Sequence, residues 1–374
     1  MLLPLLCALD IALLALGCWF AWRLPWHGPR RELTLIAGFG LVVALTLGGT
    51  AWHWFGGFAV MRAGCHALFC VYLPTLACRG IQLLCTHEPP DRRRWTTARC
   101  HALGSLFCAL IGEACYVWAR EVEPFRLEIT RERITSPRLR DLARPLRIAA
   151  IADLQPDTIG AYEVSVFDAL VAERPDLVVF LGDTLCRYAP GFPTQRDLLH
   201  RQLARLSPTF GMFAVDGDAD AGGARDIFAG SRVEVLIDGH RELPGLPIDV
   251  LGLSHSRSRR TALDAGLVRH LGDERFCIVL GHAPDYMRSV LEGGLRTEAL
   301  FLAGHTHGGQ VQVPGFGPLI TLSSVPRWLA AGGVFRSGDC WLAVSRGIGM
   351  ERDDSPRIRF WCRPQLLLLE LRAP

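Results

Sequence analysis

The segment ALFLAGHTHGG, residues 299–309, contains the pattern that decides the fold. Its first half is a short apolar run typical of a buried strand, and its second half places His305 and His307 among three glycines. Glycine permits sharp turns and a close approach of the backbone to a ligand. Paired buried imidazoles without a ligand would leave polar atoms unsatisfied. The segment therefore predicts a strand that ends in a metal-binding loop.

Upstream apolar runs end in the same way, in residue types that bind metals. They are followed by Asp153-Leu154-Gln155, Gly182-Asp183, Gly217-Asp218-Ala219-Asp220 and Gly281-His282. A single Gly-Asp after a strand is usually a turn, but five such endings in order are far more specific. Binding sites of α/β sheets form at strand ends, so we expect these side chains to meet. Carboxylates and imidazoles together suit Mn, Fe or Zn.

Beyond residue 120, short apolar runs alternate with turns and amphipathic helices. We expect a helix over Val164–Ala172. We expect buried strands at Leu146–Ala152, Leu177–Leu181, Met212–Val215, Ile248–Leu253, Phe276–Leu280, Ala299–Leu302, Trp341–Val344 and Leu366–Leu371. This alternation, followed by a strand-rich end, predicts an α/β sandwich.

The first 120 residues have a different character. Four apolar stretches, each approaching the roughly 20 residues that span a bilayer, lie at about 2–22, 33–52, 59–78 and 100–118. Asp10 and Glu113 lie within the first and the fourth stretch. Intramembrane acids are functional candidates, but snorkelling or interhelical hydrogen bonding explains both equally well. We therefore predict an N-terminal region of about four transmembrane helices and leave the role of both acids open.

The distribution of arginine predicts the orientation of these segments. Arginines cluster in the loops after the first and third segments, which the positive-inside rule places in the cytoplasm. Four arginines between residues 120 and 133 favour the opposite orientation. On balance we predict an integral protein of the cell inner membrane whose C-terminal domain is extracytoplasmic.

Charge and cysteine content exclude two other classes. The formal net charge of +3 gives no reason to expect a nucleic-acid partner. Nine of the 13 cysteines lie between Cys7 and Cys115, mostly in apolar runs, and none forms a CxxC or Cys/His zinc pattern. We interpret them as small hydrophobic residues rather than as a disulfide framework.

The ordered motifs resemble those of the calcineurin-like metallophosphoesterase family, over about Pro145 to the C-terminus. The family pattern is Asp-x-His, Gly-Asp, Gly-Asn-His-Asp, a lone His and Gly-His-x-His. Ser345–Gly349 and Pro356–Phe360 are similar to the bacterial YkuE-like branch, and the membrane segments are similar to those of transmembrane metallophosphoesterases. The resemblance implies a membrane region (1–120), a connector (121–145) and a four-layer α/β/β/α sandwich (146–374).

The resemblance also implies two divalent cations, with Mn favoured over Fe and Zn. One would be bound by Asp153, Gln155, Asp183 and His307, and the other by Asp183, Asp218, His282 and His305, with Asp183 bridging as a catalytic residue. Two cations about 3.5–4 Å apart bind phosphate oxygens and generate a hydroxide for in-line attack. The implied function is hydrolysis of a phosphate ester or pyrophosphate, on a phosphorylated small molecule or a membrane lipid headgroup.

Two residues depart from the family pattern. Gln155 replaces a histidine, although an amide oxygen still ligates. Ala219 stands where the family has a histidine that protonates the leaving group, and losing a general acid costs about 10²–10⁴ in rate. His255, after a predicted strand, is a candidate replacement catalytic residue, against the simpler interpretation of a loop histidine. Nearby arginines suit either phosphate binding or a solvated loop: Arg257, Arg259 and Arg260.

Two other functions stay open. Ala219 and Gln155 favour a weakened or inactive relative that serves as a binding or scaffold module at the membrane. The three histidines of the metal motifs oppose this, because an inactive site has no need for them. A transporter or sensor with an accessory domain is disfavoured by four short segments with few polar positions.

Overall fold

The computed structural model describes residues 61–62, 64–65, 67–85, 92–189, 191–272, 274–293, 295, 297–352 and 355–374. The first two predicted membrane segments, Asp10 and the beginning of the third segment lie outside these residues. The chain divides into two compact units. One comprises Met1–Arg120 and Arg352–Arg357, and the other Glu121–Glu351 and Ile358–Pro374.

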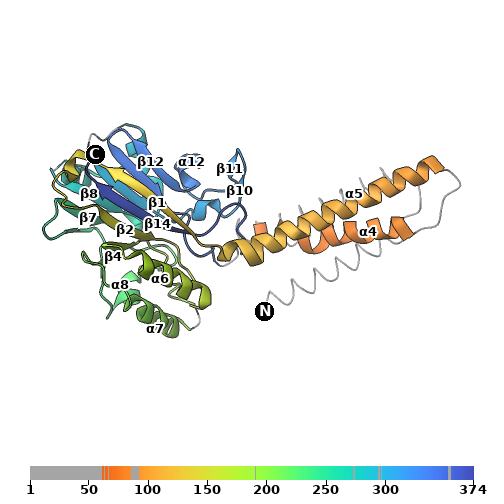
Figure 1. The fold of residues 1–374 in the computed structure, drawn as a ribbon, viewed down its shortest axis with the longest axis horizontal. Coiled ribbons are helices and arrows are strands. Elements are labelled where there is room, and N and C mark those ends of the chain that lie inside the picture. Colours follow the sequence, from red (N-terminus) through yellow and green to blue (C-terminus); the bar gives the residue numbers. More distant parts are fainter. Residues whose placement is uncertain are drawn as a thin grey trace. The chain divides into compact units, whose positions relative to one another are not determined.

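Up to Arg120, the described part of the first unit is helical. The π-helix η1 (Ala67–Tyr72) continues into α4 (Leu73–Cys85), and α5 (Arg92–Val117) continues into η2 (Trp118–Val122). Helices α4 and α5 pack side by side (Figure 1). By length and composition, Leu68–Cys85 and Arg99–Phe125 are able to cross a membrane, each with a mean hydropathy of 1.5. These two stretches correspond to the third and fourth predicted segments, shifted or extended toward the C-terminus.

The second unit contains two six-stranded mixed sheets. The first has the order β1 (Glu128–Thr135), β14 (Gln365–Arg372), β2 (Leu146–Ile151), β3 (Leu177–Phe180), β4 (Met212–Ala214) and β5 (Val233–Val235). The second has the order β12 (Gly333–Ser337), β13 (Cys340–Val344), β9 (Ala299–Ala303), β8 (Phe276–Leu280), β7 (Ile248–Gly252) and β6 (Gly239–Glu242). Strands β2 to β5 are parallel, as are β7, β8, β9 and β13. A small antiparallel hairpin joins β10 (Gln312–Val313) to β11 (Gly317–Pro318).

The helices of this unit are short, apart from two. They are α6 (Ala161–Glu173), α7 (Phe192–Leu203), α8 (Ala224–Phe228), α9 (His255–Ser258), α10 (Ala265–Leu271), α11 (Arg288–Leu291) and α12 (Arg327–Ala330). Single 3₁₀ turns form at η3 (Glu123–Phe125), η4 (Pro137–Leu139), η5 (Pro284–Met287) and η6 (His307–Gly309). Glu163 at the third position of α6 accepts a hydrogen bond from the Gly160 N–H, which marks where that helix begins.

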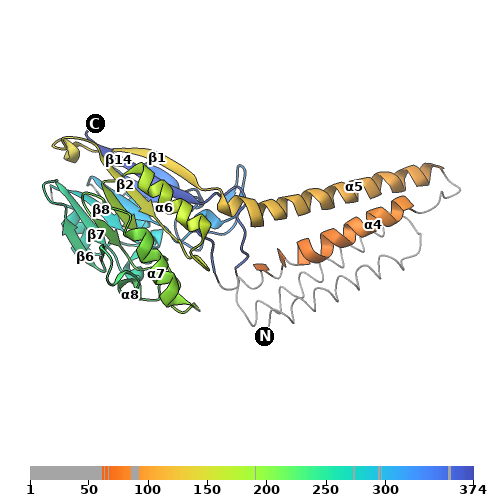
Figure 2. The ribbon, with the colours of Figure 1, turned by 60° about the horizontal axis from the view of Figure 1, so that its bottom comes forward.

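Three hydrophobic clusters define the layers of the second unit. One lies between the sheets and joins residues such as Val179 of β3 to Ile278 of β8. Another packs the first sheet against α6, α7 and α8 (Figures 1 and 2). The third packs the second sheet against α10, α11 and α12. The unit is therefore mixed α/β, with helices outside two apposed sheets, which is consistent with the implied sandwich.

All nine predicted strand and helix segments form as expected, with ends that differ by no more than a few residues. Strand β1, however, lies in the range predicted as a connector. Its sequence, EITRERIT, is polar or charged apart from Ile129 and Ile134 and lacks an apolar run. The strand lies at the edge of the sheet and pairs with β14. An edge strand tolerates charged residues that a central strand excludes. The sheet consequently begins earlier than the sequence indicated.

Candidate metal centre

Three neighbouring strands of the first sheet each end in a carboxylate. Asp153 follows β2, Asp183 follows β3 and Asp218 follows β4. The first two are buried, whereas the side chain of Asp218 is 47% exposed. Because these strands are parallel, their C-terminal ends lie at one edge of the sheet and bring the three carboxylates together.

Three neighbouring strands of the second sheet end in histidines. His255 follows β7, His282 follows β8, and both His305 and His307 follow β9. His282, His305 and His307 are buried, and His255 is partly exposed. The ring centroids of His282 and His305 lie 5.0 Å apart, and those of His255 and His282 lie 5.6 Å apart. The imidazoles thus gather as the carboxylates do, but from the other sheet.

Carboxylates and imidazoles meet in two overlapping groups. In each group the potential ligand atoms all lie within 4.8 Å of one another: Asp153, Asp183 and His282 in one, Asp218, His282 and His305 in the other. His282 is the member that the groups share, although the resemblance implied Asp183 in that position. Asp183 Oδ2 lies 3.4 Å from His282 Nε2, so it adjoins both groups.

The backbone at these residues is unusual. Among the described residues, positive φ values occur at five of the predicted ligands: Asp153 (49°), Gln155 (31°), Asp183 (52°), His305 (68°) and His307 (48°). Residues other than glycine rarely adopt this conformation, and it concentrates at functional sites. The sequence led us to expect that the adjacent glycines would form the sharp turns. In the structure, most of the positive φ values at these turns belong to the ligand residues themselves. The surrounding hydrogen bonds must therefore hold this strain.

The adjacent glycines instead permit close approach. A Cβ atom on Gly217 would lie 2.1 Å from Asp183 Oδ1, and one on Gly347 would lie 2.7 Å from Asp153 Oδ2. Neither distance is compatible with a side chain. These two positions need glycine because a carboxylate from a neighbouring loop occupies the space where a side chain would stand.

Asp220 organises the loops that carry the first-sheet carboxylates. Its buried carboxylate accepts hydrogen bonds from the backbone N–H groups of Asp183, Thr184, Leu185 and Gly217, at 2.7–3.2 Å. Burial and the negative charge of Asp183 raise the pKa of Asp220 to about 7. The Ala219 N–H in turn donates to Asp183 Oδ1 at 2.8 Å. The sequence motif contained Asp220, but its supporting role becomes visible only through these contacts.

The hydrogen bonds of His282 fit a metal ligand. Its Nδ1 lies 2.8 Å from the carbonyl oxygen of Leu181, which fixes a proton on Nδ1 and turns Nε2 toward the carboxylates. Nε2 lies 2.7 Å from Asp218 Oδ1. Backbone carbonyls commonly orient metal-binding imidazoles in this way. A cation between these groups would replace the Nε2 proton without any other change in the partners of the ring.

The electrostatics of the two groups are those of a site built for positive charge. Burial raises the pKa of Asp153 well above its usual value, despite the opposing effect of His282. Burial alone would lower the pKa of His282, but the charge of Asp183 and its neighbours raises it well above the usual value. Burial raises the pKa of Asp218 too, but hydrogen bonds from His282 and His305 outweigh it and lower that pKa. Carboxylates buried so closely need positive charge.

His307 belongs to neither group, yet it also fits a ligand. Both of its ring nitrogens are buried and make no hydrogen bond to a described residue. Its Nε2 lies 3.7 Å from Glu351 Oε2, and burial together with Arg359 holds its pKa well below the usual value. Buried polar atoms are normally satisfied. A neutral, unsatisfied imidazole beside a cluster of carboxylates is suited to a cation.

The two departures from the family pattern have defined surroundings. The Gln155 side-chain amide donates to Asp183 Oδ2, so the oxygen is the atom of this amide that could ligate a cation. Ala219 is half-buried and contributes only its backbone N–H. His255 Nε2 lies 4.0 Å from Asp218 Oδ1, is buried and makes no hydrogen bond to a described residue. Burial and the charge of His282 lower the pKa of His255.

The predicted arginines separate into different roles. Arg257 binds Asp264 and Asp238, which ties it into the surface of the loop. Arg259 extends the other way, and its Nη1 lies 2.6 Å from His305 Nε2. Arg257 is thus paired with aspartates, whereas Arg259 contacts a predicted metal ligand, and binding of an anion by these arginines stays a prediction.

Sequence reasoning missed Glu351 and Arg359. Glu351 lies beside His307, in a loop without a ligand pattern. Arg359 is fully buried, and its guanidinium donates to the carbonyl oxygens of Arg346, Gly347, Gly349, His307 and Cys362. It thereby holds the loop that carries Gly347 against Asp153. Arg359 lies in the tail Pro356–Phe360, whose resemblance to one branch of the family was its sequence signal, whereas Glu351 lies in neither tail.

No protein-family model matches the chain. Curated relatives nevertheless match over most of their length. The uncharacterized metallophosphoesterase YkuE of Bacillus subtilis is 27% identical over 277 residues, which cover 71% of this chain and 92% of YkuE. The phosphodiesterase YaeI of Escherichia coli is 27% identical over 266 residues, covering 67% of this chain and 90% of YaeI.

A further relative is the UDP-2,3-diacylglucosamine pyrophosphatase LpxG of Chlamydia trachomatis, 27% identical over 313 residues, which cover 68% of this chain and 92% of LpxG. This chain is a homologue of metallophosphoesterases. The resemblance predicted from the sequence motifs is therefore confirmed. The relatives and the clustered Asp and His side chains together support a hydrolase of phosphate esters that binds divalent metal.

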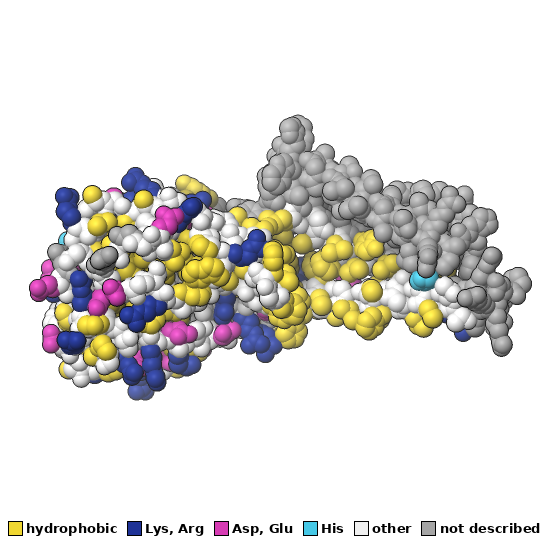
Figure 3. Space-filling view, turned by 90° about the horizontal axis from the view of Figure 1, so that it is seen from above, with side chains coloured by type: hydrophobic (Ala, Val, Ile, Leu, Met, Phe, Trp, Pro, Cys, Tyr) yellow, Lys and Arg dark blue, Asp and Glu magenta, His cyan; other side chains and the backbone are white. Residues whose placement is uncertain are grey.

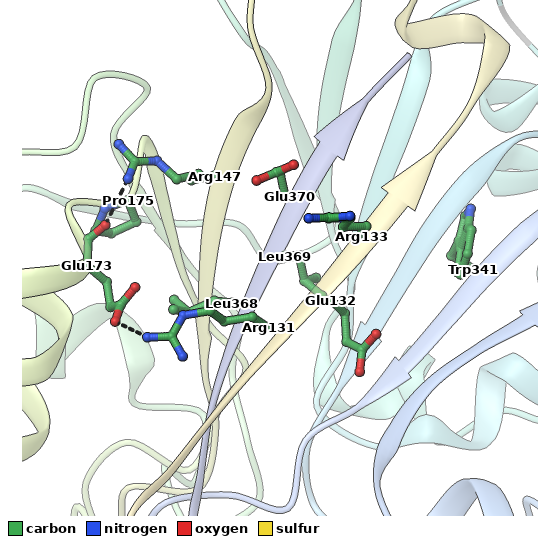
Figure 4. A pocket seen from close by; sticks show the side chains of 10 residues that line it. All are labelled: Arg131, Glu132, Arg133, Arg147, Glu173, Pro175, Trp341, Leu368, Leu369 and Glu370. Carbon is green, nitrogen blue, oxygen red and sulfur yellow. Dashed lines mark hydrogen bonds and ion pairs between the residues drawn. The ribbon is translucent and has the colours of Figure 1, made fainter. Parts of the chain in front are cut away.

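A separate cavity of about 520 Å³ lies on the first sheet (Figure 4). Its lining includes Arg147 at the beginning of β2, so it lies at the opposite end of that strand from Asp153. Three arginines and three glutamates line it, and pairs such as Arg131 with Glu173 satisfy one another (Figure 4). Its charges are balanced internally, unlike those of the candidate metal centre.

Proposed function

We propose that this protein is a membrane-anchored phosphoesterase that uses two divalent cations, with Mn favoured, to hydrolyse a phosphate ester or pyrophosphate. The observation that carries the proposal is the meeting of three carboxylates from one sheet with the imidazoles of His282 and His305 from the other, at the C-terminal ends of parallel strands. Carboxylate and imidazole donors suit Mn, Fe or Zn. The raised pKa of Asp153 and the unsatisfied nitrogens of His307 support binding of positive charge there.

The proposed ligands follow the family pattern. They are Asp153, Gln155, Asp183 and His307 for one cation, and Asp183, Asp218, His282 and His305 for the other. Two cations bound there would neutralise phosphate charge and lower the pKa of a water molecule. The protein's own contribution is orientation: Leu181 holds the ring of His282, and Asp220 holds the loop of Asp183.

His255 is the proposed partner of the leaving group. Its Nε2 is buried, lies near Asp218 and makes no hydrogen bond to a described residue, so it is able to engage a bound substrate. A histidine near a reacting oxygen commonly contributes as an acid or base. With Ala219 at the usual position, we propose that the substrates are those with good leaving groups, such as pyrophosphates.

The proposed substrate is a phosphorylated small molecule or a lipid headgroup. The names of the relatives support both chemistries, since YaeI is a phosphodiesterase and LpxG a pyrophosphatase of a diacylated nucleotide sugar. A nucleic-acid substrate is disfavoured by a net charge of only +3.

We propose that residues 1–120 form the membrane region and that the catalytic domain begins with the segment that contains β1. Two helices with the length and composition of membrane spans support the anchor. The arginine distribution supports an extracytoplasmic domain in the cell inner membrane. A reporter enzyme fused after Pro374 should be active only when exported, and a cytoplasmic signal would reverse the proposed orientation.

The decisive test measures metal content and activity together. The full chain in lipid nanodiscs should bind about two Mn ions per chain and hydrolyse bis-nitrophenyl phosphate or a nucleotide pyrophosphate, and chelation should remove both properties. Fewer than about one ion per folded chain after Mn addition would overturn the proposal. Two bound ions without activity on any phosphate ester would instead support the scaffold function.

A further inference from the structure

An exposed apolar surface borders the candidate metal centre. We define the apolar strip as six residues of the hairpin and the segments that follow it: Val313, Phe316, Leu319, Ile320, Leu322 and Trp328. Each is between 39% and 57% exposed. Figure 3 shows hydrophobic side chains gathered on the face that carries β10, β11 and α12. Contiguous apolar patches of this kind on a folded domain commonly mark binding surfaces.

The apolar strip is joined directly to the metal-binding loop. His307 and Val313 are only six positions apart, and the Leu319 N–H donates to the Val311 carbonyl oxygen at 3.2 Å. A Cβ atom on Gly309 would lie 2.4 Å from Pro318 Cβ, so the loop after His307 packs tightly against the hairpin. The hairpin therefore has a fixed position beside the site.

Arg259 lies at the border between the two surfaces. Its Nη1 is 2.6 Å from His305 Nε2 and 3.4 Å from the carbonyl oxygen of Leu322 in the strip. A second cation, the guanidinium of Arg327, lies 4.1 Å from the centre of the Phe316 ring. Arg257, by contrast, is neutralised by two aspartates. Positive charge is thus fixed where the polar site meets apolar surface.

This juxtaposition suits a ligand with an anionic end and a hydrocarbon end. A small, fully polar phosphate would contact the bound cations and Arg259 but would leave the strip in water. We propose that the apolar strip binds the hydrocarbon chain of an amphiphilic phosphate substrate, whose phosphate lies at the metal centre and against Arg259. The inference rests on the proposed function and narrows its substrate class to lipid-like phosphates.

A series of substrates with one leaving group tests the inference. The full chain in phosphatidylcholine nanodiscs with Mn is assayed on methyl, butyl and hexyl p-nitrophenyl phosphate, each below its micellar concentration. Since every diester releases nitrophenolate, only the contact with the chain changes. We expect kcat/KM to rise by about two- to fourfold per methylene, as a partly to fully buried methylene produces. A rate that does not depend on chain length would overturn the inference.

Paired variants assign the effect to the strip. The double substitution Phe316→Ser with Leu319→Ser should reduce the ratio of the hexyl to the methyl rate by about tenfold, because two large apolar contacts are lost. Val268→Ser removes an aliphatic side chain of similar exposure on α10 and should leave that ratio unchanged. An unchanged ratio in the double variant would show that the chain binds elsewhere, or only partitions into the nanodisc, and would overturn the inference.

A binding measurement separates this inference from the proposed function. Methyl-, butyl- and hexylphosphonate are not hydrolysed, and their affinity for the Mn-loaded protein is measured by equilibrium dialysis. We expect the affinity to rise with chain length, and to rise less steeply in the double variant. This result would support binding of the hydrocarbon chain by the apolar strip even if no ester is hydrolysed. Hydrolysis of the methyl ester with phosphonate affinities that do not change with chain length would preserve the proposed function and reject the strip.

Discussion

The two sheets of the second unit contribute opposite chemistry to one site. Strands β2, β3 and β4 of the first sheet end in carboxylates, whereas β7, β8 and β9 of the second end in imidazoles. Either set alone would be poor: three close carboxylates repel one another, and imidazoles alone supply no negative charge. Their apposition creates a mixed donor set that suits transition metals. The site therefore exists only where the sandwich brings the two sheets together.

The sheets also support their ligands differently. On the first sheet, backbone N–H groups surround Asp220, and an N–H of Ala219 contacts Asp183. On the second, the Leu181 carbonyl contacts His282, while His307 has no hydrogen bond to a described residue. Backbone N–H donors thus hold the carboxylates of Asp183 and Asp220, and a backbone carbonyl acceptor orients the imidazole of His282. We expect changes on the carboxylate side to have the larger effects, because they alter charge as well as geometry.

The largest effect is expected at Asp183. Asp183→Asn should lower kcat/KM by about 10³-fold or more, the upper range for an electrostatic group in an active site, and should weaken binding of both cations. The loss arises because the residue adjoins both groups and carries charge. His305→Asn is the matched change on the other sheet. It should weaken the binding of one cation only and lower kcat/KM by a smaller factor. Metal content and steady-state kinetics are measured on both; equal losses would remove the distinction between the sheets.

Gly217→Ala tests the close approach on the carboxylate side. The new Cβ would stand 2.1 Å from Asp183 Oδ1, so the carboxylate must move. A shift of a catalytic group by about 1 Å commonly lowers the rate by about 10²-fold. Gly160→Ala, where the nearest atom would be 3.7 Å away, is the control and should retain activity. Full activity of Gly217→Ala would show that the Asp183 carboxylate can move away from the new side chain without loss of function, which would contradict this interpretation.

Asp220→Asn tests the support behind the ligands. One amide oxygen cannot accept the four N–H groups that the carboxylate accepts, so the loop of Asp183 should shift. We expect a loss of about 10–100-fold in metal affinity or activity, as for residues that orient metal ligands. Asp216→Asn is a buried control, whose carboxylate accepts from Ala224 instead, and should cost less. A larger loss in the control would place the support of the site elsewhere.

The smallest expected effect is a gain. Ala219→His restores an imidazole on the first sheet and should raise the rate on a poor alkyl leaving group by about tenfold, with little change for nitrophenolate, which needs no proton. His255→Asn should do the reverse and reduce the rate on poor leaving groups selectively. Rates of matched alkyl and nitrophenyl esters decide the matter. Equal responses of both esters would show that neither position protonates the leaving group.

Local patterns predicted much of this fold. Buried strands are short apolar runs bounded by turn residues, so β2, β3, β8 and β9 were visible in the sequence. The exception, β1, is an edge strand whose charged residues erase that signal. Glu351 also lacked a recognisable pattern, and the sequence left two interpretations of Arg259 open, because one charged residue in a loop looks the same whether it faces solvent or a site.

The sequence by itself determined that five strand ends carry metal-ligand residues in a family-like order, since residue type and spacing are local properties. Only the tertiary structure decided that the acids and imidazoles come from different sheets and that His282 lies between them. It also decided that the ligand residues, rather than the glycines, take the strained turns, and that an apolar strip adjoins them. These features depend on contacts between residues far apart in the chain, and no local pattern of side chains encodes such contacts.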